Sequence, residues 1–251
     1  MNIKVKTMKV FDVHTHMPKP NSEGLDAYLS FLEHSTEVVG ANLILNTEEE
    51  VEVVLKNIGK IPNNIILIPY YSVNSQLPAE LISSGWYKIH PKLKKITLIN
   101  ITAIVESVTT TKPKGLIIDS FPWGTELEYN VSLPLVLAIA KALPETFVLV
   151  AHGGGYESWA FRAHTGSLQN VIYDFSATLA YYQNSDILKP YQRYLKFSTE
   201  RVLFGSDWPI ANVTEQIFES IRLANEIGIS EKELENIFLS NSRRLWNYIH
   251  T

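Results

Sequence analysis

The chain has 251 residues, of which 45% are apolar and 19% are charged, so one large domain can build a sizeable core. The formal net charge of -4 argues against nucleic acid as the main partner, because phosphate binding needs a surplus of Lys and Arg. Cysteine is absent, which excludes disulfides and thiolate sites and leaves histidine and carboxylates as protein ligands for a metal.

The N-terminal segment and the lengths of the apolar runs indicate whether the protein is exported or inserted into a membrane. The first 16 residues turn polar too soon for a signal peptide, and no apolar run approaches the roughly 18 residues of a membrane helix. We therefore expect a soluble, cytoplasmic protein with no membrane partner.

Short apolar runs rich in β-branched residues alternate with segments of helical period, and their near-continuous hydrophobicity is typical of buried parallel strands. The expected strands are 8–13, 38–45, 64–71, 86–89, 114–119, 146–152, 170–176 and 201–207. The expected helices are 22–33, 47–58, 132–142, 213–227 and 230–240, while 91–112 fits either a helix or a strand-like run. Candidate helix caps are Ser22, Thr47 with Glu50 as a capping box, Asn212 or Thr214, and Ser230.

Repeated alternation of strands and helices predicts a parallel sheet with right-handed crossovers. Eight strands are the number that a closed (β/α)8 barrel requires, and this TIM-barrel fold typically takes about 250 residues. No linker or repeat divides the sequence. We therefore predict a single α/β domain, a TIM barrel over 1–251 with a C-terminal helix.

Polar residues follow the expected strands at their carboxyl ends, where the side chains of a barrel point into one shared mouth. These residues are His14, His16, His90, Asp119, His152 and Asp207. Their regular placement predicts that they converge on one small site.

The His14-Thr15-His16 segment is the most informative of these pieces. Residues i and i+2 of a strand face the same way, so both imidazoles can reach one metal ion. Asp207 ends the eighth run, which lies beside the first in a closed barrel, and offers a third ligand, a base for water, or both. The alternatives are two surface histidines and a helix cap at Asp207, but Trp208-Pro209 separates this residue from the next helix.

His152 ends the sixth run and precedes three glycines, 153–155, which leave room at the barrel mouth. It is interpreted as a metal ligand or as a neutral electrophile that polarises the substrate; the alternative is a structural histidine.

Further candidates for substrate binding lie around the fourth and sixth strands. His90, with Lys88 on the same strand face, either touches the substrate or stabilises the following loop. Trp86 and Tyr156 are expected to line an apolar pocket, with core or rim packing as the alternative.

Five motifs, FDVHTH, GWYKIHP, VLVAHGGG, NVIYDFSAT and RVLFGSDWP, resemble the amidohydrolase superfamily in its amidohydrolase-2 branch. That branch includes aminocarboxymuconate-semialdehyde decarboxylase and related hydroxybenzoate decarboxylases. The C-terminal LENIFLSNSRRLW resembles the family's closing helix. The resemblance covers nearly the whole chain in the family's order; it is specific for the superfamily and not for a substrate.

The resemblance implies that His14 and His16 bind the metal, that Asp207 is the strand-eight ligand or base, and that His152 is the strand-six histidine. One departure is the missing strand-five histidine. Asp119 stands there and offers a replacement ligand that would favour a harder ion; alternatively the site is weak. The KIHP context resembles the mononuclear branch, so we expect one divalent ion, zinc, with manganese as the alternative.

These residues lead us to expect a metal-dependent hydrolase that activates water against a small ester, lactone or amide. Non-oxidative decarboxylation of a small unsaturated or aromatic acid is the alternative, and a binding barrel without catalysis is a third hypothesis. The expected partner is a small-molecule substrate, and analogy with related enzymes suggests a homodimer.

Overall fold

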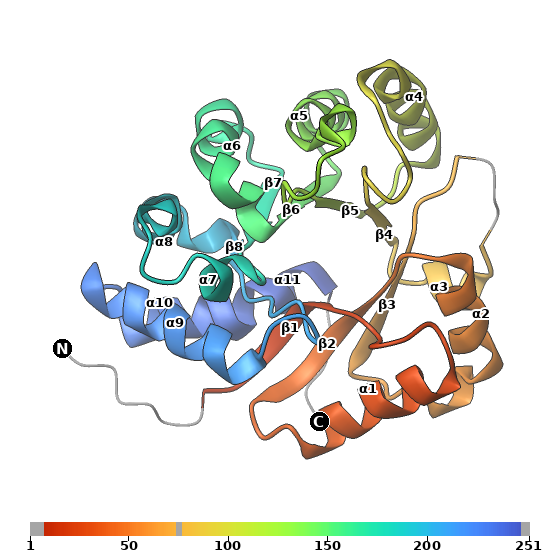
Figure 1. Cartoon of the computed structure of the whole chain (residues 1–251), viewed down its shortest axis with the longest axis horizontal. Coiled ribbons are helices and arrows are strands. Elements are labelled where there is room, and N and C mark those ends of the chain that lie inside the picture. The colour runs from red at the N-terminus through yellow and green to blue at the C-terminus, as the bar shows by residue number, and fades with distance from the viewer. Residues whose placement is uncertain (1–7, 74–76, 247–251) are drawn as a thin grey trace.

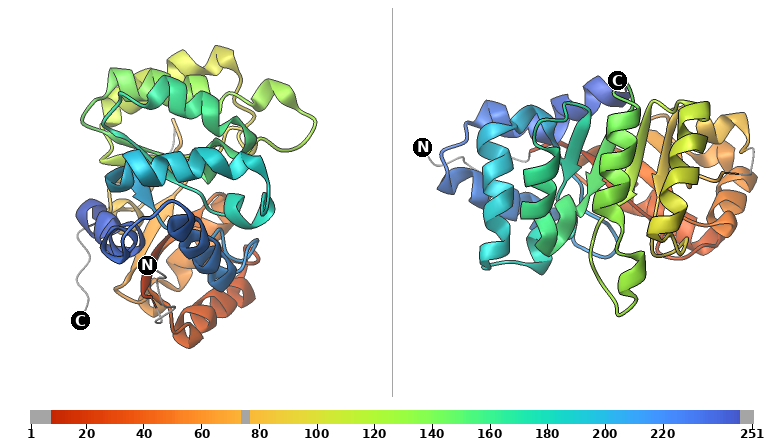
Figure 2. Two further views of the ribbon diagram at one scale, coloured as in Figure 1. Left: turned by 90° about the vertical axis from the view of Figure 1, so that its left-hand side faces the viewer. Right: turned by 90° about the horizontal axis from the view of Figure 1, so that it is seen from above.

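Eight strands form the centre of the structure, a computed structural model that describes residues 8–73 and 77–246. The strands are β1 (Val10–Thr15), β2 (Val38–Leu45), β3 (Ile65–Pro69), β4 (Trp86–Ile89), β5 (Gly115–Asp119), β6 (Phe147–Ala151), β7 (Val171–Asp174) and β8 (Val202–Leu203). They pair in the orders β1-β2-β3 and β4-β5-β6-β7-β8, and every pair is parallel. The helices lie outside the strands (Figures 1 and 2).

Two seams join these groups of strands into a barrel. Between β3 and β4, the amide of Tyr71 donates to the carbonyl oxygen of Lys88 at 2.7 Å. Between β8 and β1, the amide of Val13 donates to the carbonyl oxygen of Phe204 at 3.0 Å. An isolated parallel bridge extends each seam. The predicted TIM barrel is therefore confirmed.

Each of the five predicted helical ranges contains a helix. The α-helices are α1 (Ser22–His34), α2 (Glu48–Lys56), α3 (Ala79–Ile82), α4 (Ile101–Thr111), α5 (Ser132–Ala142), α6 (Ser158–Thr165), α7 (Thr178–Tyr181), α8 (Lys189–Phe197), α9 (Val213–Glu226), α10 (Glu231–Glu235) and α11 (Asn241–Trp246). Those in the predicted ranges are α1, α2, α5, α9 and α10 in chain order. The shorter turns are η1 (Ile58–Lys60), η2 (Leu98–Asn100), η3 (Leu127–Tyr129), η4 (His152–Glu157), η5 (Asp186–Leu188), η6 (Thr199–Arg201) and the π-helical η7 (Asn236–Ser240). No helix in these described ranges has both the length and the apolar character needed to cross a membrane.

The ambiguous segment 91–112 contains α4, and the helices α6, α7 and α8 were not predicted. They have only four to nine residues each, although α8 buries Tyr191, Tyr194 and Leu195 at helical spacing. Amphipathic periodicity is a weak signal over so few residues.

Local capping explains where several helices begin. Thr47 and Glu50 form the predicted capping box of α2 through both of its hydrogen bonds. Ser230 caps α10, also as predicted. The prediction for Ser22 is wrong: the Asn21 side chain caps α1 instead, because its Oδ1 accepts from the amide of Gly24 in the first turn.

The inside of the barrel is filled at the amino-terminal end of its strands. There the ring of Trp86 lies 4.6 Å from that of Trp246 on α11 and 6.3 Å from that of Phe147. Gly115 permits this packing, since an added Cβ would meet the Trp86 ring at 2.5 Å. The apolar plug leaves the opposite, carboxyl-terminal end for polar residues.

Candidate functional site

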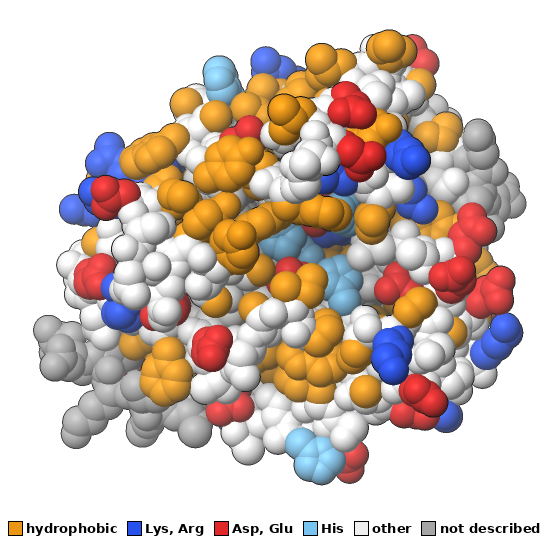
Figure 3. Space-filling view, viewed as in Figure 1, with side chains coloured by type: hydrophobic (Ala, Val, Ile, Leu, Met, Phe, Trp, Pro, Cys, Tyr) orange, Lys and Arg blue, Asp and Glu red, His pale blue; other side chains and the backbone are white. Residues whose placement is uncertain are grey.

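The carboxyl ends of the strands surround one cavity of about 520 Å³. Figure 3 shows histidine side chains at the bottom of a hollow that hydrophobic side chains border. Predicted site residues from five different strand ends line it: His16, His90, Asp119, His152 and Asp207. The structure thus brings these distant residues together, as expected for this fold.

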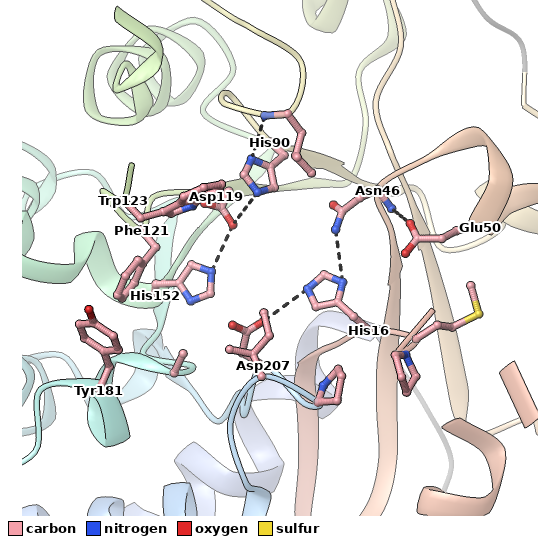
Figure 4. A pocket seen from close by; sticks show the side chains of 16 residues that line it. His16, Asn46, Glu50, His90, Asp119, Phe121, Trp123, His152, Tyr181 and Asp207 are labelled. Atoms are coloured by element: carbon pink, nitrogen blue, oxygen red, sulfur yellow. Dashed lines mark hydrogen bonds and ion pairs between the residues drawn. The ribbon is translucent and has the colours of Figure 1, made fainter. Parts of the chain in front are cut away.

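His14 and His16 project toward Asp207, while Thr15 between them points away and donates to the carbonyl oxygen of Asn42 at 2.6 Å. Oδ1 of Asp207 lies 3.4 Å from Nε2 of His16 (Figure 4). The same oxygen lies 3.7 Å from Nε2 of His14. One ligand atom of each of the three residues lies within 4.8 Å of those of the other two. One small cation can contact all three at this spacing.

The backbone holds Asp207 in an uncommon conformation. Its φ is 68°, in the left-handed region, and its amide donates to the carbonyl oxygen of His14 at 2.8 Å. Residues held in such sparsely populated conformations cluster at functional sites. Asn212, and not Asp207, caps α9. The alternative interpretation of Asp207 as a helix cap therefore does not apply.

Asp174 and Ser176, at and just after the end of β7, contact the Nδ1 atoms of His14 and His152. The Ser176 hydroxyl donates to Asp174, so its oxygen can only accept from other groups. Nδ1 of His14 and Nδ1 of His152 each lie 3.0 Å from this oxygen. Nδ1 of His14 also lies 3.3 Å from Oδ2 of Asp174. Both histidines therefore carry a hydrogen on Nδ1 and turn Nε2 toward the site.

His16 has a comparable partner in Asn46, whose side-chain amide lies 3.3 Å from Nδ1 of this histidine (Figure 4). The Asn46 Oδ1 is buried without a hydrogen-bond partner among the described residues. Exchanging the amide oxygen and nitrogen lets Oδ1 accept a hydrogen from Nδ1 of His16. In that arrangement Nδ1 of His16 carries the hydrogen, which leaves Nε2 of His16 free as a ligand.

The protonation states of His14 and Asp207 also suit a metal site. Burial, reinforced by the charge of Lys88, lowers the pKa of His14 to about 4, so the imidazole is neutral. Burial tends to raise the pKa of Asp207, but the hydrogen bond to His16 and nearby histidines lower it to about 2. Neutral imidazoles and a carboxylate are the forms that bind divalent ions. The residues present therefore fit a metal ion.

Lys88 and Asp119 form a second cluster beside the three candidate ligands. The buried Lys88 ammonium lies 3.3 Å from both Asp119 Oδ2 and His14 Nε2. His90 Nε2 lies 3.7 Å from the same carboxylate oxygen. Among the described residues, Asp119 does not share the compact ligand group of His14. Its role as a replacement ligand stays a prediction, and its closest observed partners are Lys88 and His152.

His152 is tied to Asp119 across the cavity floor. Its φ is 61°, and three glycines with positive φ follow it, which turns the chain sharply after β6. Its Nδ1 donates to the carbonyl oxygen of Ser176 at 2.8 Å, and its Nε2 lies 3.1 Å from Asp119 Oδ2. Burial tends to lower the pKa of His152, but the charge of Asp119 raises it to about 9. The prediction of a neutral electrophile is therefore wrong for this arrangement, which holds an imidazolium.

The sequence analysis missed four residues that support the site. Asp12 accepts hydrogen bonds from the amides of His14 at 3.2 Å and Ser206 at 2.9 Å, joining β1 to the segment after β8. The others are Asn46, Asp174 and Ser176. Asn46, Asp174 and Ser176 lie at or just after strand ends, so the rule that identified His90 and Asp119 could have found them.

Two candidates for substrate binding do not reach the cavity. Trp86 is fully buried in the aromatic plug, because it begins β4 while the site lies where β4 ends. Tyr156 is half exposed on η4 and is not among the residues that line the cavity. The expectations for both are wrong. Lys88 lies beneath the floor, whereas His90 is exposed to the cavity.

A barrel with histidines and carboxylates at the carboxyl ends of its strands defines a class of (β/α)8 enzymes. Residues 104–248, more than half of the chain, match the sequence model of the amidohydrolases. The chain therefore belongs to the amidohydrolase family, in its amidohydrolase-2 branch, and is an enzyme. A comparison with functionally curated proteins finds no match.

Solved structures show the same fold at low sequence identity. An amidohydrolase from Burkholderia multivorans with bound zinc is 14% identical, with a TM-score of 0.64 and coverage of 96% of this chain and 100% of that chain. An uncharacterised TIM-barrel protein from Bordetella bronchiseptica is 12% identical, with a TM-score of 0.67 and coverage of 95% and 98%. A dihydroorotase from Campylobacter jejuni is 11% identical, with a TM-score of 0.61 and coverage of 96% and 84%. These likenesses establish the barrel fold.

Proposed function

We propose that this enzyme is a metal-dependent hydrolase in which one divalent ion is bound by His14, His16 and Asp207. The convergence of three ligand atoms within 4.8 Å at the cavity floor carries this proposal. The substrate is a small ester, lactone or amide, which a cavity of about 520 Å³ can hold.

The residues around the ligands supply proton transfer and orientation. When bound, the ion supplies Lewis-acid chemistry. The Asp207 carboxylate accepts a proton from the attacking water, since its low pKa keeps it ionised at neutral pH. The Nε2 hydrogen of the His152 imidazolium points to Asp119 in the free enzyme, and in this proposal it turns toward the oxygen of the scissile carbonyl as negative charge develops there. Asp119 keeps this imidazole protonated.

Zinc is the proposed ion, because two imidazoles and one carboxylate with an open position resemble catalytic zinc sites. The bound zinc of the Burkholderia multivorans amidohydrolase supports the same choice. Manganese is the alternative. The pairing of Lys88 with Asp119 supports a single ion, because both side chains already have partners.

Metal analysis and two variants test the proposal. The protein is purified without chelators, its metal content is measured by mass spectrometry, and hydrolysis is assayed with phenyl acetate, a δ-lactone and a small amide. We expect about one zinc per chain in the wild type and loss of metal in His14→Ala. The matched control His34→Ala removes an exposed histidine of α1 and should retain the metal.

Asp207→Asn keeps an oxygen near the histidines but removes the proton acceptor. We expect kcat to fall by about 10²–10⁴-fold, with a smaller change in metal content. Failure of the wild type to take up metal on titration, or full activity in Asp207→Asn, contradicts the proposal.

Decarboxylation is less well supported by the cavity. None of the described residues that line it is Lys or Arg, the usual partners of a substrate carboxylate. Release of CO₂ from small aromatic acids, without hydrolysis of the esters, would favour decarboxylation instead.

A further inference from the structure

We infer that the substrate is an uncharged ester, lactone or amide that carries a flat apolar group such as an aryl ring. This inference rests on the proposed hydrolytic function and concerns the part of the substrate that does not react. It follows from the distribution of apolar surface and charge around the cavity.

The cavity is divided into a polar floor and an apolar upper wall. Nine of the sixteen lining residues have apolar or aromatic side chains, and Figure 4 shows Phe121, Trp123 and Tyr181 on the side of His152 and Asp119. Ile210, which is 77% exposed, also lines the cavity. A ligand whose reacting carbonyl reaches the floor must therefore place its remaining atoms against apolar side chains.

Aromatic rings form a corner beside His152. The Phe121 ring lies 5.6 Å from the His152 ring and 5.4 Å from the Tyr181 ring, at interplanar angles of 82° and 87°. Tyr181 remains 72% exposed and Trp123 51% exposed. Covering these surfaces with a planar apolar group removes apolar area from water and permits edge-to-face contacts. The corner thus fits a flat ring better than a hydroxylated chain.

The charges in the cavity disfavour an anionic substituent. Three carboxylates line it, those of Glu50, Asp119 and Asp207, and no Lys or Arg does so among the described residues. Both cationic groups at the floor, Lys88 and His152, lie within 3.3 Å of Asp119. An anionic substituent on the substrate would lose its hydration in the cavity without gaining a Lys or Arg partner among the described lining residues.

Another cation, Lys92, lies beside Trp123 at the rim of the cavity. The Lys92 ammonium lies 5.0 Å from the centroid of the Trp123 ring, a cation–π distance, and Lys92 does not line the cavity. It therefore supports the position of Trp123. An anion held by Lys92 is an outcome that the experiment below detects.

Two matched pairs of probes test the inference. Binding of acetophenone and of 4-acetylbenzoate, which are not hydrolysed, is measured by NMR titration of the zinc-loaded enzyme. Hydrolysis of phenyl acetate and of 4-carboxyphenyl acetate is measured in parallel. The members of each pair differ by one carboxylate. We expect the neutral member to be favoured at least about tenfold, in Kd and in kcat/KM.

Variants connect this preference with the aromatic wall. Trp123→Ala and Tyr181→Ala should each raise the Kd of acetophenone about fivefold or more. Trp159→Ala is the control, since Trp159 on α6 is similarly exposed but does not line the cavity.

The outcomes separate the inference from the proposed hydrolysis. Selective binding of acetophenone that depends on Trp123 and Tyr181, without ester hydrolysis, supports the inference and contradicts the hydrolytic function. Ester hydrolysis without preference for the neutral probes overturns the inference and leaves the hydrolytic function intact. Binding of 4-acetylbenzoate as tight as that of acetophenone, or no binding of either ketone at millimolar concentration, also overturns the inference.

Discussion

The amide nitrogen of Asp207 donates a 2.8 Å hydrogen bond to the carbonyl oxygen of His14, although the two residues come from opposite ends of the described chain. This bond belongs to the seam that closes the barrel between β8 and β1. It fixes the backbone of one candidate ligand to that of another. The geometry of the proposed metal site therefore depends on barrel closure.

Substitution of Gly205 should disturb this seam. A Cβ added at Gly205 would lie 3.0 Å from Cβ of His14 and 3.2 Å from Cβ of Ser176. We expect Gly205→Ala to weaken zinc binding about tenfold and to destabilise the protein by about 1–3 kcal/mol. Chelator competition and urea unfolding measure the two effects. Gly59→Ala, where an added Cβ meets nothing within 4 Å, should leave zinc affinity unchanged; an equal loss there would contradict the packing explanation.

Asp174 and Ser176 are expected to act through the histidines that they orient. Removing the Ser176 hydroxyl or one Asp174 oxygen weakens the pair of contacts that orients Nδ1 of His14. We therefore expect Ser176→Ala and Asp174→Asn to weaken zinc binding by about 10–100-fold. Zinc competition assays and kcat/KM for a hydrolysed ester provide the measurement.

The control for these variants is Asp186→Asn, which changes an exposed carboxylate that pairs with Lys189. It should behave like the wild type in both assays. Unchanged zinc affinity in Ser176→Ala and Asp174→Asn together would refute the positioning role.

Lys88 competes with a metal ion for His14. Its ammonium lies 3.3 Å from His14 Nε2, the atom that would bind the ion. Lys88→Met should therefore strengthen zinc binding several-fold, while loss of the buried ion pair with Asp119 costs about 3–5 kcal/mol of folding stability. Calorimetric titration with zinc and urea unfolding test both parts.

The double variant Lys88→Met with Asp119→Asn also removes the Asp119 charge. It should recover most of the folding stability that Lys88→Met loses. Weaker zinc binding in Lys88→Met would show instead that the ammonium supports the site.

The pairing of His152 with Asp119 predicts a specific pH dependence of stability. Burial tends to lower the pKa of His152, but the charge of Asp119 outweighs this effect. The folded-state pKa of His152 is therefore about 9, above the value of 6.5 for an unperturbed histidine. This contribution is fully present below about pH 6.5 and is lost as the pH rises through about 9. For the metal-free protein, the free energy of unfolding should fall by up to about 1.4 kcal/mol per pH unit between pH 7 and 9.

Urea unfolding at pH 7, 8 and 9 measures this slope, with Asp119→Asn as the comparison. The variant should show a much flatter dependence. Asp12, whose pKa burial raises to about 7, titrates at the lower end of this interval and is present in both proteins, so it contributes equally to both slopes. Parallel slopes in the two proteins would exclude the His152–Asp119 pair as the cause.

The alternation of apolar runs along the sequence was sufficient to predict the barrel, because buried parallel strands need continuous hydrophobicity. The short helices α6 to α8 were missed, since four to nine residues are fewer than the window over which helical periodicity is reliable. Trp86 was assigned to the wrong end of the barrel. An apolar ring packs equally well into a plug or a pocket, and only its neighbours distinguish the two.

The sequence by itself determined which polar residues stand at strand ends, and therefore that His14, His16 and Asp207 could meet. Strand period and barrel closure dictate that meeting without reference to side-chain detail. Only the tertiary structure decided that Asp119 pairs with Lys88 and His152, and that Ser176 lies between two histidines. Protonation and pairing depend on burial and on distances of a few ångströms between side chains from different strands, which sequence spacing does not specify.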